Sequence, residues 1–258
     1  MVVDDKVNVE EMDESIDLFA EPEGYYPPSP KPTTEQHSFL SGRTVTVSLV
    51  GQNPLWGHHL WNAGRIISHY LEKQPALIQN KTVLELGAGA GLPSLVCSIL
   101  GAKQVVVSDY PDPDLVQNLW KNIDAIKQDS KIDGNVVAEG YCWGADTTAL
   151  SSHITEPGFD ILILADLLFN HSEHEKLVST IELTLKKGPE SKALVFFTPY
   201  RPWLYDKDMA FFETCKERGF VVDKVLEEKM EKVMFEADPG DEELRRTVFG
   251  YVITWPSS

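Results

Sequence analysis

Apolar residues recur along the chain with two periods, one typical of strands and one typical of helices. Short apolar or alternating runs predict strands over residues 44–49, 82–86, 104–108, 135–139, 160–165, 192–198, 220–226 and 247–255. Helical spacing predicts helices over residues 56–71, 92–100, 113–126, 173–185 and 207–218. The run 160–165 is almost continuously apolar, as a strand buried on both faces should be. Strands that alternate with helices through short links favour an α/β fold with a mostly parallel sheet and helices on both faces.

The first 36 residues differ from the rest of the chain in composition. Residues 1–24 carry nine acidic side chains against Lys6 alone, and five prolines follow between positions 22 and 32. Such a segment buries too little apolar surface to offset the entropy lost on ordering, so we expect residues 1–36 to be largely disordered. Residues 37–258 have the length and composition of one large domain.

The overall charge and the cysteine content narrow the classes of function. A formal net charge of −17 argues against binding to a nucleic-acid backbone, which needs clustered Lys and Arg, but it favours a basic protein partner. The three cysteines form no CxxC pair, which indicates a reducing compartment and neither a disulfide framework nor a cysteine zinc site. The sequence shows no signal-peptide pattern and no apolar run of membrane-spanning length, so we expect a cytoplasmic protein without a membrane partner. The histidines lack the HExxH pattern, and we expect no metal site.

A glycine-rich turn follows the strand predicted over residues 82–86. Gly87, Gly89 and Gly91 let the backbone turn tightly and approach a ligand, where the next helix presents free N–H groups. Leu92 stands at the third glycine of the dinucleotide motif GxGxxG, which weakens that interpretation. Asp109 ends the following strand, 22 residues after Gly87, where a carboxylate reaches a ribose diol. These residues predict a nucleoside cofactor and leave both NAD and S-adenosylmethionine open.

Several segments resemble motifs of the seven-strand class I methyltransferases. Residues 84–89 (Leu-Glu-Leu-Gly-Ala-Gly) resemble the first motif of that superfamily. Residues 60–64 (Leu-Trp-Asn-Ala-Gly) resemble the Trp-containing entry helix of its protein-lysine methyltransferases, and residues 142–144 (Cys-Trp-Gly) resemble their Trp-Gly motif. Residues 165–169 (Ala-Asp-Leu-Leu-Phe) resemble their Asp-x-x-Tyr motif, with Phe169 in place of Tyr.

Two longer segments, 49–64 and 108–112, together with the lead-in 18–25, resemble one subgroup. This subgroup is the fungal protein N-terminal and lysine methyltransferases of translation elongation factor 1-alpha, once described as nicotinamide N-methyltransferase-like. The resemblance implies a Rossmann-like seven-strand sheet with one antiparallel strand near an edge, and S-adenosylmethionine as cofactor over a domain 37–258. It further implies a monomer that methylates the N-terminal glycine α-amine and the adjacent lysine of elongation factor 1-alpha.

The resemblance also implies which residues form the site. The glycine turn would line the methionine part of the cofactor, and aromatic residues would flank the adenine and close the pocket. The residues implied to bind the cofactor are Trp56, Trp61, Gly87, Ala88, Gly89, Asp109, Trp143 and Ala165. Asp166 follows a fully apolar strand, and a buried carboxylate there needs a partner or a role, so we expect it to orient the substrate amine as the catalytic residue. Residues at the same edge of the sheet that could contact substrate are Phe169, Tyr200, Arg201 and Trp203.

Methyl transfer from a sulfonium is a direct displacement, so it requires alignment of a neutral amine and no nucleophilic side chain of the enzyme. Two other enzyme classes fit the same motifs. One is a methyltransferase of a small amine such as nicotinamide, and the other is an NAD-dependent oxidoreductase. A cofactor-binding module without catalysis is a third alternative.

Overall fold

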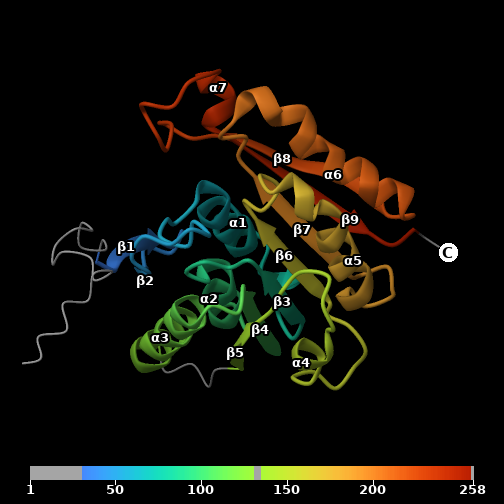
Figure 1. Cartoon of the computed structure of the whole chain (residues 1–258). Helices are drawn as coiled ribbons and strands as arrows, with labels where there is room; N and C mark the ends of the chain where they lie inside the picture. The colour runs from blue at the N-terminus through green and yellow to red at the C-terminus, as the bar shows by residue number, and fades with distance from the viewer. Residues whose placement is uncertain (1–30, 131–134, 257–258) are drawn as a thin grey trace, which may run out of the picture. The chain divides into compact units, whose positions relative to one another are not determined.

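The computed structural model describes residues 31–130 and 135–256, which are built around a seven-stranded sheet (Figure 1). The strand order is β5-β4-β3-β6-β7-β9-β8. Strand β9 runs antiparallel to both of its neighbours, and the remaining pairs are parallel. This confirms the mostly parallel sheet that the sequence pattern predicts and the antiparallel strand near an edge that the family resemblance implies. The strands are β3 (Thr82–Leu86), β4 (Gln104–Asp109), β5 (Val136–Gly140), β6 (Ile161–Ala165), β7 (Lys192–Phe197), β8 (Val221–Lys229) and β9 (Thr247–Thr254).

Helices cover both faces of the sheet (Figure 1). One face carries α1 (Asn62–Lys73), α2 (Leu92–Ile99) and α3 (Pro113–Ser130), and the other carries α4 (Thr148–Ser151), α5 (His174–Thr184) and α6 (Tyr205–Glu217). The remaining short helices are α7 (Glu242–Arg245), η1 (Pro75–Leu77), η2 (His171–Glu173) and η3 (Pro202–Leu204).

Successive residues of each central strand enter two separate apolar cores. Val105 and Val107 of β4 pack in the core beneath α1 and α2, whereas Val106 packs in the core beneath α5 and α6. Side chains alternate between the faces of a strand, so a strand buried on both sides is apolar at most of its positions. This explains the continuous apolar runs in the sequence.

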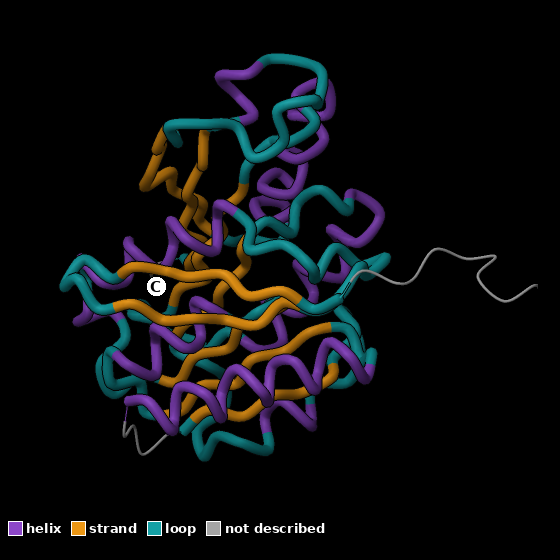
Figure 2. The backbone as a smooth tube through the Cα atoms, turned by 90° about the vertical axis from the view of Figure 1, so that its left-hand side faces the viewer, coloured by secondary structure: helices purple, strands orange, loops and turns teal. Residues whose placement is uncertain are grey.

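The structure corrects two bounds predicted from the sequence. Residues 33–36 belong to strand β1 (Thr33–Ser38), which pairs antiparallel with β2 (Thr44–Leu49) in a hairpin on one side of the molecule (Figure 2). The polar sequence of β1 hid it, because its order comes from contacts with β2 and α1. Of the rest of the segment, residues 31–32 are exposed and have no regular secondary structure, and residues 1–30 lie outside the described residues.

The predicted helix 56–71 begins only at Asn62, and residues 56–61 form a loop. Trp56 adopts a positive φ of 63°, which a right-handed helix does not accommodate. The apolar side chains before Asn62 mimicked helical spacing because they line a cavity instead of a helix face. In the described part of the chain, no helix is both long and apolar enough to cross a membrane.

Asn122 of α3 ties the hairpin to the glycine turn. Its Oδ1 accepts a hydrogen bond from Ser48 N at 2.7 Å, and its Nδ2 donates to Ala90 O at 3.0 Å and to Ser48 O at 2.9 Å. The side chain is only 2% exposed. A buried amide that satisfies three backbone groups fixes the relative position of β2, α3 and the turn after β3.

Candidate active site

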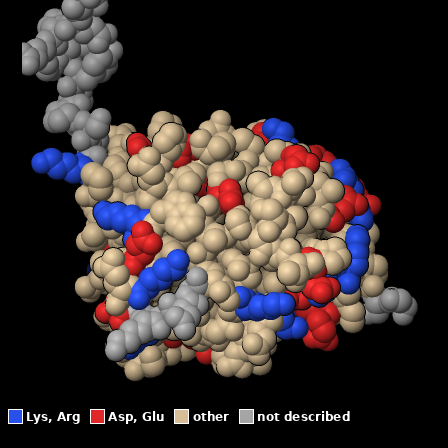
Figure 3. Space-filling model, turned by 90° about the horizontal axis from the view of Figure 1, so that it is seen from below, with Lys and Arg blue, Asp and Glu red and all other residues tan. Residues whose placement is uncertain are grey.

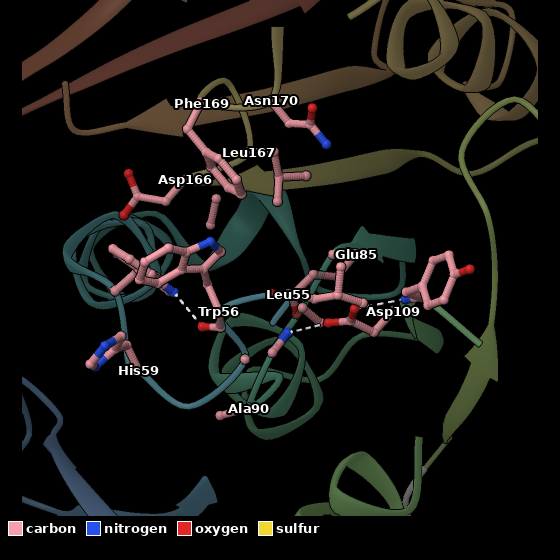
Figure 4. A pocket seen from close by; sticks show the side chains of 18 of the residues that line it. Leu55, Trp56, His59, Glu85, Ala90, Asp109, Asp166, Leu167, Phe169 and Asn170 are labelled. Atoms are coloured by element: carbon pink, nitrogen blue, oxygen red, sulfur yellow. Dashed lines mark hydrogen bonds between the residues drawn. The ribbon is translucent and has the colours of Figure 1, made fainter. Parts of the chain in front are cut away.

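A cavity of about 700 Å³ opens at the carboxyl ends of β3, β4 and β6. The chain order of the strands reverses at β3, and ligands of open α/β sheets bind at such a switch point. Figure 4 shows Glu85 and Asp109 on one side of this cavity and Asp166 and Phe169 on another. The structure brings together most of the residues predicted for the site, namely Trp56, Trp61, Gly87, Ala88, Gly89, Asp109, Trp143, Ala165, Asp166, Phe169 and Arg201. Tyr200 and Trp203 do not line the cavity.

The glycine turn requires its glycines for two different reasons. Gly87 and Gly89 have φ values of 56° and 55°, in the left-handed region that favours glycine. A Cβ at Gly87 would lie 2.7 Å from Leu167 Cδ2 and 3.1 Å from Trp143 Cζ2, whereas a Cβ at Gly89 would meet nothing within 4 Å. Gly87 therefore permits close packing against Trp143, and Gly89 borders open space.

Asp109 fixes the turn and remains able to accept further hydrogen bonds. Its Oδ2 accepts from Gly89 N at 2.6 Å, and its Oδ1 accepts from Tyr110 N at 2.7 Å. Burial raises the pKa of Asp109, although both backbone N–H groups oppose the shift. A carboxylate has about four lone-pair sites, so each oxygen can accept one more donor, as two neighbouring hydroxyls of a ribose would require.

Glu85 is a further residue of the cavity wall, beyond those predicted from the sequence. It is 1% exposed, and its Oε2 accepts a hydrogen bond from Ser94 N in the first turn of α2 at 2.9 Å. The N-cap of α2 is Gly91, which has no side-chain acceptor, so Glu85 satisfies this helix end from β3. Burial raises the pKa of Glu85 to about 8. An acidic residue inside an apolar strand was the available sequence signal.

Asp166 joins three elements through its carboxyl group. Its Oδ2 accepts from Ala63 N in the first turn of α1 at 2.9 Å, and its Oδ1 accepts from Thr198 N after β7 at 2.6 Å. The Tyr200 hydroxyl donates to Oδ2 at 3.4 Å. Asp166 has a positive φ of 56°, and burial raises its pKa to about 7. The side chain thus holds the start of α1 against the ends of β6 and β7, and its expected contact with a substrate amine stays a prediction.

An aromatic cluster stands beside the cavity. The ring of Trp61 lies 5.1 Å from that of Tyr200 and 5.9 Å from that of Phe235, measured between centroids. Phe235 comes from the connection between β8 and β9, and no periodic pattern in the sequence pointed to it. Two large apolar side chains that line the cavity are exposed, Trp56 by 50% and Phe169 by 41%. Trp203, which does not line it, is 59% exposed. Exposed apolar surface beside a polar cavity is typical of a binding site for another molecule.

Comparisons with known proteins agree with this geometry. A model of the lysine methyltransferase family matches residues 45–218. A protein of Neurospora crassa named protein N-terminal and lysine N-methyltransferase efm7 is 56% identical over 248 residues, covering 93% of this chain and 88% of that protein. A protein of the same name from Schizosaccharomyces pombe is 43% identical over 250 residues, covering 94% of this chain and 96% of that protein.

Solved structures show the same fold at low sequence identity. A putative RNA methyltransferase from Pyrococcus horikoshii aligns with a TM-score of 0.53 at 21% identity, over 79% of this chain and 90% of that chain. A putative methyltransferase complexed with SAH aligns with a TM-score of 0.51 at 13% identity, over 87% of this chain and 56% of that chain. The chain therefore belongs to the lysine methyltransferase family, with the class I fold and S-adenosylmethionine as methyl donor.

Proposed function

We propose that this enzyme methylates the N-terminal glycine α-amine and the adjacent lysine of translation elongation factor 1-alpha. The observation that carries the proposal is the identity of 56% and 43%, over nearly the whole chain, with relatives named protein N-terminal and lysine N-methyltransferases. The choice of elongation factor 1-alpha rests on the resemblance of residues 49–64 and 108–112 to the enzymes that modify it. A monomeric state and a cytoplasmic location belong to the same proposal.

The described residues fit the cofactor. Gly89 borders open cavity space, and the Asp109 carboxyl has acceptor capacity left for a ribose diol. Trp143 packs against Gly87 and offers a flat apolar face for the adenine, and Ala165 lies in the same wall. Trp56 and Trp61 would close the cavity from the side of α1, with Trp61 Nε1 donating to Trp56 O at 3.2 Å.

When bound, S-adenosylmethionine supplies a methyl group on a sulfonium, which an amine lone pair displaces. The protein must therefore receive a neutral amine, align it and exclude water. An α-amine, with an ordinary pKa of about 8, loses its proton far more readily than a lysine at about 10.4. The N-terminal amine is accordingly the more accessible nucleophile at neutral pH.

Charge and exposed aromatic surface suit a basic protein segment. The net charge of −17 attracts a lysine-rich chain end. On the face that Figure 3 shows, acidic and basic side chains lie in small separate groups, one acidic group near the middle, with uncharged surface between them. A nucleic-acid backbone would instead require a continuous basic surface.

In this proposal Asp166 positions the start of α1 relative to the end of β7. Because both of its oxygens accept backbone N–H groups, it would place the start of α1, and with it Trp61, relative to the end of β7. Direct orientation of the amine would use the lone pairs that remain on the same carboxyl group. If Asp166→Asn kept full turnover and unchanged cofactor affinity, neither role would hold.

Mass spectrometry of peptides tests the substrate. The purified enzyme and S-adenosylmethionine are incubated with the N-terminal peptide of elongation factor 1-alpha, with the same peptide acetylated at its α-amine, and with a version carrying Arg at the adjacent lysine. We expect methyl groups on both amines of the first peptide and on one amine of each blocked peptide. Free nicotinamide is incubated with the enzyme and S-adenosylmethionine in parallel. Methylation of nicotinamide with none on the peptides would favour the small-molecule alternative and refute the proposal.

A further inference from the structure

A second cluster of chemically competent side chains lies where the β1–β2 hairpin meets α1. His37 on β1 and His69 and Glu72 on α1 each offer one ligand atom, and these three atoms lie within 4.8 Å of one another. Among the residues that the structure describes, no other group of three His, Cys, Asp or Glu side chains meets this criterion. None of the three lines the cavity of the methyltransferase site.

Backbone hydrogen bonds position Glu72 and His69 so that each turns a ligand atom towards the cluster. Leu40 N donates to Glu72 Oε2 at 2.8 Å, and Glu72 Oε1 faces His37 Nε2 at 3.5 Å. Ser38 O lies 3.0 Å from His69 Nε2. A carbonyl can only accept, so Nε2 carries the proton and Nδ1 of His69 keeps its lone pair. A histidine that gives one ring N–H to a backbone carbonyl is the usual arrangement of a metal ligand.

The distances suit a small tetrahedral ion. His37 Nε2 lies 3.5 Å from Glu72 Oε1, which is long for a hydrogen bond. Zinc bonds of 2.0–2.1 Å to nitrogen and oxygen place neighbouring ligand atoms about 3.4 Å apart. The largest separation in the cluster exceeds that value by at most about 1.4 Å. The Glu72 side chain is 6% exposed and His69 is partly exposed, so binding of the ion would close this gap by a small shift of His69 towards the buried pair His37 and Glu72.

We propose that His37, His69 and Glu72 bind one zinc ion that cross-links the β1–β2 hairpin to α1. Two imidazoles and a carboxylate form a common three-residue zinc set, with water at the fourth position on the exposed side. The neighbouring Arg65 guanidinium is paired with Glu35 at 2.9 Å and donates to Gln36 O at 2.8 Å, so Glu35 neutralises this cation. The Glu72 carboxylate would offset part of the charge that the ion brings. The ion would fasten the hairpin to the helix whose first turn forms part of the cavity wall.

Zinc titration of the metal-free protein tests the proposal. The full chain is stripped with a chelator, titrated with zinc chloride by calorimetry and followed by thermal unfolding. We expect one zinc per chain and a rise in Tm of roughly 5–10 °C at a free zinc concentration about 100 times Kd. Cobalt(II) in place of zinc should give the visible absorption of a tetrahedral site.

Two conservative variants and one matched control locate the ion. His69→Gln removes a half-exposed ligand, and Glu72→Gln removes the charge but keeps an oxygen for Leu40 N. Each should weaken zinc binding at least about tenfold and, at the same free zinc concentration, reduce the gain in Tm to about half or less. The control His153→Gln alters a histidine that pairs with Glu139 outside the cluster, and it should bind zinc as the unchanged protein does.

Binding of S-adenosylhomocysteine, measured on every variant, shows whether the fold is intact. The proposal would be overturned by stoichiometric zinc binding that His69→Gln leaves unchanged, since the ion would then sit elsewhere, for example at the exposed Cys142. Failure of the intact protein to bind zinc, or a cobalt spectrum without tetrahedral bands, would overturn it equally.

Discussion

Asp166→Asn probes the carboxyl group that joins α1 to the ends of β6 and β7. Asn keeps one oxygen but presents an NH₂ group to the second of the two backbone donors, Ala63 N and Thr198 N. A buried donor left without its acceptor costs about 1–3 kcal/mol of stability. We therefore expect Asp166→Asn to lower the free energy of unfolding by that amount at pH 5.5.

The loss in free energy of unfolding that Asp166→Asn causes should decrease as the pH rises. Burial raises the pKa of Asp166 to about 7 from an ordinary 3.8, so the folded state holds this proton more tightly than the unfolded state does. The contribution of the group to stability is then greatest below pH 3.8, falls as the pH rises towards 7 and is constant above it. The free energy of unfolding of the unchanged protein therefore decreases by about 2 kcal/mol between pH 5.5 and 8.5. This decrease arises below the pKa of about 7, at 1.36 kcal/mol per pH unit. The variant has no such loss, so its destabilisation should shrink by about 2 kcal/mol.

Urea unfolding of both proteins at pH 5.5 and 8.5 measures this difference directly. Subtracting the variant from the unchanged protein at each pH removes the titration of all other groups, including that of Glu85, whose pKa is raised to about 8. A destabilisation that is equal at the two pH values would refute the buried, proton-holding carboxyl. No destabilisation at pH 5.5 would refute the role of its two backbone hydrogen bonds.

Three further substitutions test other parts of the site. Gly87→Ala should weaken binding of S-adenosylhomocysteine at least about tenfold in calorimetry, because its Cβ would lie 2.7 Å from Leu167. Gly42→Ala, with a positive φ but nothing within 4 Å, is the control and should bind normally. Asn122→Ala should lower the free energy of unfolding by about 2–4 kcal/mol, against about 1 kcal/mol for Asn118→Ala, which gives up a single hydrogen bond to Ser48 O. An equal loss in the two Asn variants would contradict the tie to the glycine turn. Phe235→Ala should raise KM for the protein substrate severalfold with cofactor affinity unchanged, and an unchanged KM would exclude the aromatic cluster from substrate binding.

The local pattern of the chain determined the central sheet and the cofactor side of the cavity. Strands buried on both faces are apolar at most of their positions, so the runs that form β3, β4 and β6 were visible with nearly their observed bounds. The glycine turn and Asp109 were visible because a strand, a turn and a helix that follow one another bring these residues together through short-range geometry. The residues of this wall needed no knowledge of distant contacts.

Tertiary structure alone decided the features whose parts lie far apart in the chain. Strand β1 is polar and becomes ordered by pairing with β2, and Phe235 reaches Trp61 across more than half of the sequence. The carboxyl of Asp166 was expected to face a substrate, but the fold supplies backbone donors from α1 and β7 that no local pattern could reveal. His37 meets His69 and Glu72 for the same reason. Periodicity records which face of an element is buried, whereas the partner that covers this face is chosen by long-range packing.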